Sequence, residues 1–212
     1  LLISPCAIFC SLCLFFNATA TTDFYPLPLH AALPILNVST TTTLRAAAFK
    51  DSHLPTNIDT QTYIFLDDVV DQNGAGFPSS WGPKTADYAL DQDLIGPGKT
   101  HENTIRDDLQ AVATVSIVMD VDDLFGPSGI YSNTQSRGIS WERPASFELI
   151  DPDGGAEIQV NAGVRLHGGG SRGSWMPKHS LRVYFKGEYG SPTLQFPLFP
   201  NSNVEVFDVL IL

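Results

Sequence analysis

Small residues and cations gather at one point in the second half of the chain. Gly168, Gly169, Gly170 and Ser171 stand between two runs of β-type residues. Around them lie four basic side chains, Arg165, Arg172, Lys178 and Arg182. Glycines let a backbone come close to a bound group or adopt a positive φ, and cations beside exposed N–H groups suit a phosphate ligand. The pattern therefore predicts a phosphate site on a strand–glycine turn–strand unit, and its alternative is a hairpin with a flexible tip.

Other polar groups give weaker indications of chemistry. Carboxylates at a strand end, Asp120, Asp122 and Asp123, can bind a hard cation, but this pattern at a strand end is more often a solvated turn, so we assign no metal site and keep the three only as weak candidates. The motif of residues 151–155 lacks the remaining ligands of a calcium loop and predicts a turn. The histidines that follow the first hundred residues have no metal spacing, namely His101, His167 and His179.

Hydrolase chemistry finds no support, because Ser116 and Ser171 have no recognisable His and Asp partners. Three tryptophans offer two interpretations, as platforms for sugars or as packing residues of a β protein. They are Trp81, Trp141 and Trp175.

Charge and composition limit the class of protein. The 212 residues include 12 basic and 23 acidic side chains, a net charge of −11. This balance argues against nucleic-acid binding and against attraction to anionic membranes, which need a basic surface. With 17 glycines, 15 prolines and many short β-type runs, the sequence predicts an α+β, mainly β protein.

Residues 1–36 differ from the rest of the chain. They hold all three cysteines, no Lys or Arg, and one acid, Asp23. The apolar run 1–16 lacks the basic start of a secretory signal and is short for a membrane span. Residues 15–35 resemble the translated read-through of a sequencing adapter. We therefore interpret 1–36 as a non-native leader, expect no membrane insertion, and expect the chain to be cut at both ends.

Three further regions are predicted. Residues 37–66 carry two β-type runs, 41–49 and 60–66, joined by a polar loop. Residues 67–113 form a loop-rich linker with one short helix, 105–112, capped by Asn103 or Thr104.

Residues 114–212 contain the strands 114–119, 145–150, 156–167 and 180–186 of an antiparallel meander, with turns at 120–127 and 151–155.

The first pair of runs resembles the end of a chitobiase/β-hexosaminidase C-terminal-type domain, an immunoglobulin-like accessory module. The resemblance covers about 30 residues, through TTTLRAAAF at 41–49 and TQTYIF at 60–65. It implies that these are the last strands of a β-sandwich, and it carries over no catalytic residue.

Four segments of the third region resemble, in order, the N-terminal part of the CotH family of spore-coat-type protein kinases. They are 114–120 with 122–125, 129–133, 141–146, and 164–172 with 177–180. The family combines such a module with the accessory domain and often a lamin-tail domain in large surface proteins. The resemblance implies an atypical kinase fold, ATP and Mg²⁺ as cofactors, and a protein substrate phosphorylated on serine.

On this resemblance the glycine turn covers the nucleotide. The N–H groups of Gly168, Gly169, Gly170 and Ser171 would face phosphate oxygens, while Arg165 or Arg172 and Lys178 would neutralise phosphate charge. We rank Lys178 first, because Pro177 fixes the chain just before it. The alternatives are a solvated Lys178 and an Arg172 that only solvates the loop tip.

The family's magnesium- and catalysis-associated aspartates lie beyond residue 212, so we expect no catalytic residue in this chain and no phosphoryl transfer by it alone. The parent would be an exported bacterial surface protein. The competing hypotheses are a non-catalytic surface or adhesion module and a carbohydrate-associated region.

Overall fold

The computed structural model describes residues 36–81, 84–151, 158–173, 175–176, 178–199 and 201–212, and the backbone of Phe9–Ser11. Most of the interpreted leader, most of the predicted turn at 151–155, and Pro177 lie outside the described residues.

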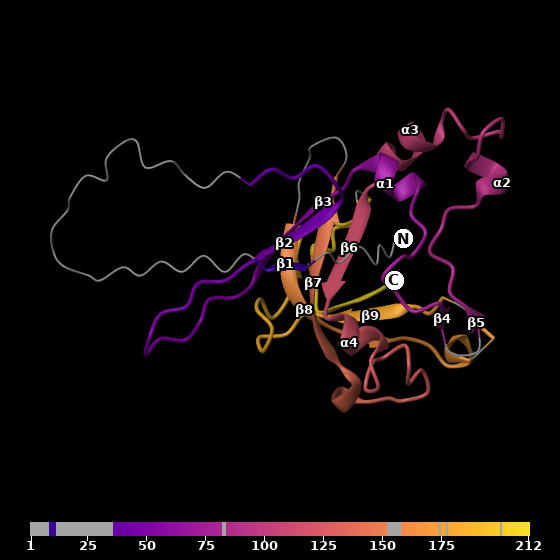
Figure 1. Cartoon of the computed structure of the whole chain (residues 1–212). Coiled ribbons are helices and arrows are strands. Elements are labelled where there is room, and N and C mark those ends of the chain that lie inside the picture. The colour runs from indigo at the N-terminus through magenta and orange to yellow at the C-terminus, as the bar shows by residue number, and fades with distance from the viewer. Residues whose placement is uncertain are drawn as a thin grey trace, which may run out of the picture.

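A five-stranded antiparallel sheet dominates the fold (Figure 1). Its strands are β6 (Thr114–Met119), β7 (Arg143–Ile150), β8 (Ile158–Leu166), β9 (Leu181–Tyr184) and β12 (Val209–Ile211). They lie in the order β12-β9-β8-β7-β6, and every neighbouring pair is antiparallel. The meander predicted from the sequence is confirmed, and β6 has the predicted bounds.

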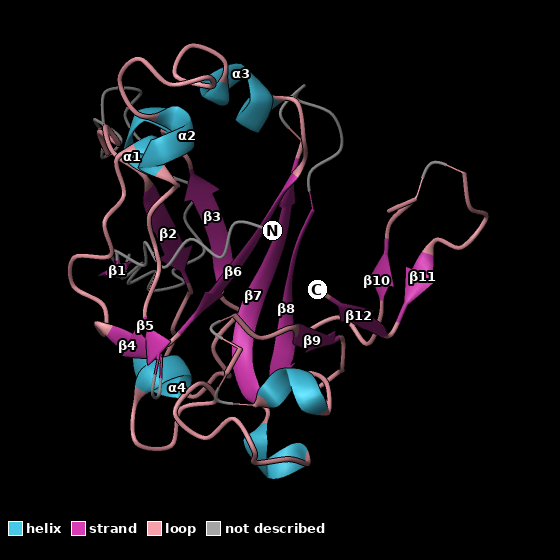
Figure 2. Ribbon diagram, turned by 90° about the vertical axis from the view of Figure 1, so that its right-hand side faces the viewer, coloured by secondary structure: helices cyan, strands magenta, loops and turns pink. Residues whose placement is uncertain are grey.

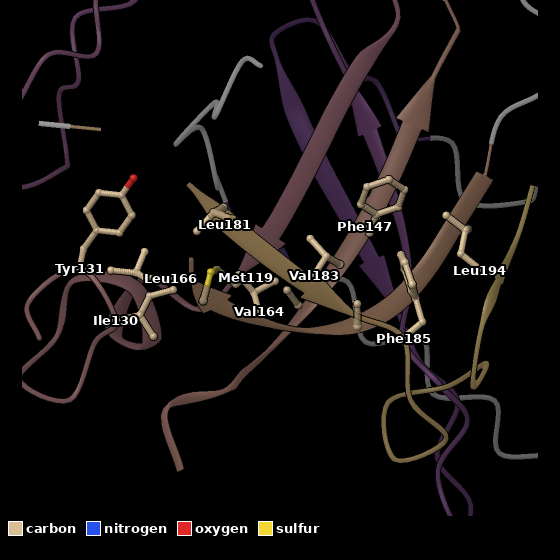
Figure 3. Close-up of a cluster of buried hydrophobic side chains, with 12 residues drawn as sticks. Met119, Ile130, Tyr131, Phe147, Val164, Leu166, Leu181, Val183, Phe185 and Leu194 are labelled. Carbon is tan, nitrogen blue, oxygen red and sulfur yellow. The ribbon is translucent and has the colours of Figure 1, made fainter. Parts of the chain in front are cut away.

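One face of this sheet is apolar because side chains alternate along each strand. Phe147 stands opposite Ile117 and Val160, and Val164 stands opposite Val183. Phe147 also meets Phe185 edge to face, with ring centroids 5.7 Å apart. Figure 3 shows Phe147, Val164, Val183 and Phe185 in the cluster of buried side chains that forms the hydrophobic core. Ile117 and Val160 pack against this cluster.

Short elements extend the core at the edges of the sheet. Helix α4 (Val121–Phe125) follows β6, and the hairpin of β10 (Leu194–Gln195) and β11 (Val206–Phe207) projects beside β12 (Figure 2). The expectation of a simple turn at 120–127 is wrong. Asp120 caps a helical turn, its Oδ1 accepting a hydrogen bond from the Asp122 N–H at 2.8 Å.

Helices at the opposite end of the sheet belong to the predicted linker (Figures 1 and 2). These helices are α1 (Leu66–Val70), α2 (Gln92–Ile95) and α3 (Ile105–Gln110). The linker also contains a short strand pair, β4 (Ser80–Trp81) and β5 (Lys84–Thr85), which lies at the end of the sheet near α4 (Figure 2). The structure confirms the predicted helix near residue 105. Thr104 occupies its N-cap position, but its hydroxyl donates to the Asp108 carboxylate rather than accepting from the backbone. None of the described helices has the length and apolarity needed to cross a membrane.

A separate hairpin precedes these helices. It pairs β2 (Thr42–Ala46) with β3 (Asp59–Tyr63), as predicted, and β1 (Phe9–Ser11) runs parallel to β2.

The hairpin lies against the polar face of the large sheet. The Thr60 hydroxyl is 2.6 Å from the Ser146 hydroxyl, and the Thr62 N–H donates to Glu148 at 2.9 Å. Ser146 and Glu148 are both buried. The hairpin also reaches β8, where Asn161 Nδ2 donates to the Ile58 carbonyl at 3.0 Å. It therefore covers the half of the polar face over β7 and the first part of β8, and leaves the half over the end of β8 and β9 for other side chains.

Candidate functional site

Cations occupy the uncovered half of the polar face. Arg165 on β8 and Arg182 on β9 stand opposite each other in the strand pairing. Seven of the twelve basic residues of this acidic chain lie between residues 137 and 186. Five of them are connected by a shared ion-pair partner, by strand pairing or by mutual repulsion. We call these five the basic cluster: Arg137, Arg165, Arg172, Arg182 and Lys186.

A buried carboxylate holds two of these cations. The Glu142 side chain, between a 3-10 turn (η1, Ile139–Trp141) and β7, is 1% exposed. Its Oε2 accepts from Arg165 Nε at 2.6 Å, and its Oε1 accepts from Lys186 Nζ at 2.5 Å. The Tyr189 hydroxyl donates to the same Oε1 at 2.9 Å. One buried charge therefore fixes two cations and a phenol.

The pKa values of this group follow from its contacts. Burial alone would raise the pKa of Glu142, but hydrogen bonds from Lys186, Arg165 and Tyr189 outweigh it and lower that pKa below 4.5. The pKa of Tyr189 shifts in the opposite direction. Burial, and then its hydrogen bonds with Glu188 and Glu142, raise the pKa of the phenol. Glu142 is therefore charged and Tyr189 neutral at physiological pH.

Space for this arrangement comes from Gly163. A Cβ atom at this position would lie 2.5 Å from Cε2 of Tyr189 and 2.7 Å from Oε1 of Glu142. Both distances are shorter than real carbon contacts, so any larger residue would push the carboxylate and the phenol apart.

The aromatic ring of Tyr184 contacts the same two cations, Arg165 and Lys186. The Arg165 guanidinium lies 4.3 Å from its ring centroid, and the Lys186 ammonium lies 5.0 Å from it. Both distances fall within the range of cation–π attraction. Carboxylate and aromatic ring together hold Arg165 and Lys186 in defined positions.

Arg172 has a different environment. Its residue is 7% exposed, and its guanidinium donates to the carbonyls of Thr134, Ser136 and Leu166. Burial, and then the nearby charges of Arg137 and Arg182, lower its pKa. Arg172 thus ties the loop at 134–136 to the end of β8, and its Nε is buried without a partner among the described residues.

The loop and β8 enclose a small hollow. It is partly open to solvent and is much too small for a typical small-molecule ligand. Eight residues line it: Ile130, Asn133, Ser136, Arg137, Trp141, Arg165, Leu166 and Arg172. The structure therefore brings Arg165 and Arg172, both predicted from the sequence, to one hollow.

The glycine turn lies beside this hollow and has the predicted glycine backbone. Gly168 has a φ of 109°, and Gly169 and Gly170 are exposed. A 3-10 turn (η2, Gly170–Arg172) follows. Within the described part of the chain, the N–H groups from Gly168 to Ser171 donate to no other group. They are available to an anion or to water.

Lys178, the first-ranked residue, does not join the cluster. It is exposed, and its ammonium group has no partner among the described residues. Lys186 is the lysine that enters the ion-pair network, and sequence reasoning missed it. The signal was the alternation of Arg182, Tyr184 and Lys186, which places all three on one face of an extended strand. The sequence around Glu142 contains no comparable pattern that would have predicted its role.

The acidic group at 120–123 has structural partners. Asp120 caps α4, and Asp123 forms an ion pair with Arg143 at 3.4 Å. Burial, outweighing that ion pair, raises the pKa of Asp123. Among the described residues, no group of three or more His, Cys, Asp or Glu side chains is arranged to hold a metal ion.

The remaining candidates separate into packed and exposed side chains. His179 is buried against Tyr131, and its Nδ1 lies 2.8 Å from the Ser171 carbonyl. His179 therefore anchors the glycine turn. Trp141 lies under the Arg143 guanidinium at 5.3 Å, whereas Trp175 is 63% exposed.

Comparison of the chain with family models, with curated proteins and with solved structures found no match.

Proposed function

We propose that residues 114–212 form the nucleotide-binding part of a CotH-like protein kinase, which uses ATP and Mg²⁺ to phosphorylate serine or threonine of a protein substrate. The observation that carries this proposal is the basic cluster, held by Glu142 and Tyr184 beside a glycine turn. Phosphoryl transfer depends mainly on positioned cations that neutralise phosphate charge. A cluster of fixed cations in a chain of net charge −11 supports that role.

The ion pair of Lys186 with Glu142 supports the proposal by analogy. In protein kinases, a lysine on a strand must pair with a glutamate before it can engage the nucleotide phosphates. Lys186 follows β9 and reaches a buried Glu142 at 2.5 Å, with the lysine 28% exposed. Its partial exposure leaves it accessible to a phosphate on the solvent side.

The glycine turn adds donors of another kind. Four successive N–H groups, from Gly168 to Ser171, are without a partner in the described part of the chain. Consecutive free N–H groups make concave anion sites. We propose that they contact phosphate oxygens and that Lys178 closes over the same ligand from the exposed side.

The resemblance assigns the magnesium- and catalysis-associated aspartates to a later part of the family's sequence. We therefore propose that residues 1–212 bind nucleotide without transferring phosphate. The hairpin at 42–63 would be the end of an immunoglobulin-like accessory module, and the parent protein an exported bacterial surface protein.

Thermal unfolding with and without Mg-ATP tests this function. A ligand that binds only the folded chain raises the melting temperature, and the rise grows with the logarithm of its concentration relative to the dissociation constant. We expect Mg-ATP to raise it, and Lys186→Met and Lys178→Ala to reduce the rise. Lys50→Ala, in an exposed loop far from the cluster, is the matched control and should leave the rise unchanged. Absence of any rise in the unmodified chain would contradict nucleotide binding.

One observation favours a second function. Trp175, two residues beyond the buried Gly173, presents a 63% exposed ring near the glycine turn, as a sugar-binding platform would. In a carbohydrate-associated or adhesion module, polysaccharide would bind the unmodified chain, Trp175→Ala would abolish binding, and Mg-ATP would have no effect.

A further inference from the structure

A run of aromatic rings connects the linker to the segment that holds the glycine turn. Tyr88 and Phe77 of the linker have ring centroids 5.7 Å apart, and Phe77 meets Phe125 of α4 edge to face at 6.5 Å. Phe125 meets Tyr131 at 5.6 Å, and Tyr131 meets the His179 ring at 5.2 Å. All of these spacings fall within the range of favourable ring–ring contact. The rings therefore form one continuous path from the linker to the residues before β9.

The glycine turn is attached to the last ring of this path. His179 is buried, and its Nδ1 lies 2.8 Å from the carbonyl oxygen of Ser171. Because a carbonyl oxygen only accepts, Nδ1 carries the hydrogen and donates it to Ser171. Tyr131 contacts His179 a second time, since its hydroxyl accepts from the His179 backbone N–H at 3.4 Å. The position of the turn therefore depends on the positions of Tyr131 and His179.

The middle of the path lies on α4 and the loop after it. The Tyr131 N–H donates to the Leu124 carbonyl at 2.9 Å, so the loop folds back on the helix. Helix α4 has only five residues, and helices this short depend on tertiary packing. Phe77 supplies such packing from the linker. Figure 2 shows the strand pair β4–β5, which stands between Phe77 and Tyr88 in the chain, near α4.

The linker holds its two rings in place by its own contacts. Gln72 Nε2 donates to the Tyr88 carbonyl, and the Tyr88 hydroxyl donates to the Pro78 carbonyl at 3.0 Å. Gly74 has a φ of 73°, and a Cβ atom there would lie 2.2 Å from Cδ2 of Tyr88. The loop is therefore shaped to receive the Tyr88 ring, which in turn contacts Phe77. We call Phe77 and Tyr88 the aromatic brace.

We propose that the aromatic brace positions the glycine turn. It packs on α4 and, through Phe125, Tyr131 and His179, sets the position of residues 168–171. The brace precedes residues 114–212, so the geometry of the turn depends on a part of the chain outside the proposed kinase region. This coupling concerns the folded chain alone and needs no ligand. Its effect on Mg-ATP affinity rests on the proposed function.

Amide hydrogen exchange of the full chain, without ligand, tests the brace. The reporters are the N–H groups of Arg172 and Gly173, which donate within η2 directly after the turn. Phe77→Leu keeps apolar bulk but removes the ring, and we expect it to speed exchange at both reporters about fivefold, as for loss of one aromatic contact. Phe49→Leu, at a 53% exposed ring, is the matched control and should leave both rates unchanged.

Amides of β8 show how much of any increase comes from global unfolding. Unchanged reporter rates in Phe77→Leu, or reporter rates that only equal those of β8, would overturn the proposal.

A double variant tests the route through His179. His179→Ala removes the hydrogen bond to Ser171 and should itself speed exchange at the reporters, whereas His179→Gln keeps a side-chain donor and should speed it less. Adding Phe77→Leu to His179→Ala should produce no further increase, because the connection is already broken. Independent, multiplying effects of the two substitutions would contradict this route.

Titration with Mg-ATP separates this proposal from the proposed function. Weaker Mg-ATP binding in Phe77→Leu, together with faster exchange at the reporters, supports both. Faster exchange in a chain that binds no Mg-ATP supports the brace and contradicts the nucleotide site. Mg-ATP binding with unchanged reporter rates in Phe77→Leu contradicts the brace and leaves the nucleotide site intact.

Discussion

Arg165 and Arg182 face each other across β8 and β9, so two positive charges occupy directly opposed positions of an antiparallel pair. Such a pairing costs stability. Glu142 compensates Arg165 through a charge-assisted hydrogen bond at 2.6 Å, whereas Arg182 has a buried Nε without a partner among the described residues. The sheet therefore carries a cost that a bound anion would relieve.

Replacing Arg182 separates stability from binding. Arg182→Gln removes one of the opposed charges, and we expect the free energy of unfolding to rise by about 0.5 kcal/mol without ligand. Urea unfolding at low salt measures this. The same variant should bind Mg-ATP more weakly. A loss of stability, with unchanged ATP affinity, would show that Arg182 is only a structural residue.

Removing the charge of Glu142 should have the largest effect on the site. Glu142→Gln leaves Arg165 and Lys186 without their counter-charge, and we expect a loss of about 3 kcal/mol. This is at the lower end for a buried ion pair, because Arg165 and Lys186 are 20% and 28% exposed. Urea unfolding at pH 7 provides the measurement. A loss below about 0.5 kcal/mol would contradict the central role of this carboxylate.

The pH dependence of the same variant gives an independent test. Because the folded state lowers the pKa of Glu142 from 4.5, its contribution is complete above pH 4.5 and is lost as pH falls through the folded-state pKa. The difference in unfolding free energy between the unmodified and Glu142→Gln chains should therefore shrink on acidification below pH 4.5. A difference that stays constant down to pH 3 would contradict this assignment.

Two glycines provide a matched pair of substitutions. Gly163→Ala places a methyl group against Tyr189 and Glu142, and we expect it to destabilise the chain by about 1–3 kcal/mol. Gly170→Ala is the control, because its added carbon meets nothing within 4 Å and the residue lies in the 3-10 turn η2. It should change stability by less than about 0.5 kcal/mol. Similar effects of both substitutions in thermal unfolding would disprove the close packing at Gly163.

Docking of the hairpin on the sheet can be tested by a double-mutant cycle. Thr60→Val and Ser146→Ala each leave a buried hydroxyl without its 2.6 Å partner, and each should cost about 1–3 kcal/mol. The double variant should cost less than the sum of the two, because the hydrogen bond between Thr60 and Ser146 can be lost only once, whereas the Ser146 hydrogen bond to Asn161 is lost equally in both variants that carry Ser146→Ala. Additive effects would mean that the hairpin and the sheet are energetically independent.

Local patterns predicted much of the sheet. The apolar run at β6 and the alternation along β8 and β9 place the strands correctly, because side-chain period reflects burial directly. The sequence also indicated that Arg165 and Arg172 lie near the glycine turn, and both line the hollow.

Long-range contacts explain what the sequence did not predict. Glu142 meets Lys186 across 44 positions of the chain, and Thr60 meets Ser146 across 86. No pattern in the neighbouring residues predicts either of these two contacts. The helical turn α4 was missed because it is only five residues long and is capped by one hydrogen bond, from the Asp122 N–H to the Asp120 carboxylate.

The dissociation constant of Mg-ATP, measured by isothermal titration at 50 and 200 mM salt, tests the basic cluster most directly. The cluster predicts saturable binding that weakens at the higher salt, because phosphate–cation attraction is screened, and weakens further in Arg182→Gln. If neither the unmodified chain nor the control Arg106→Gln, at an exposed arginine paired with Asp67, binds Mg-ATP at either salt concentration, a nucleotide site on this sheet is contradicted.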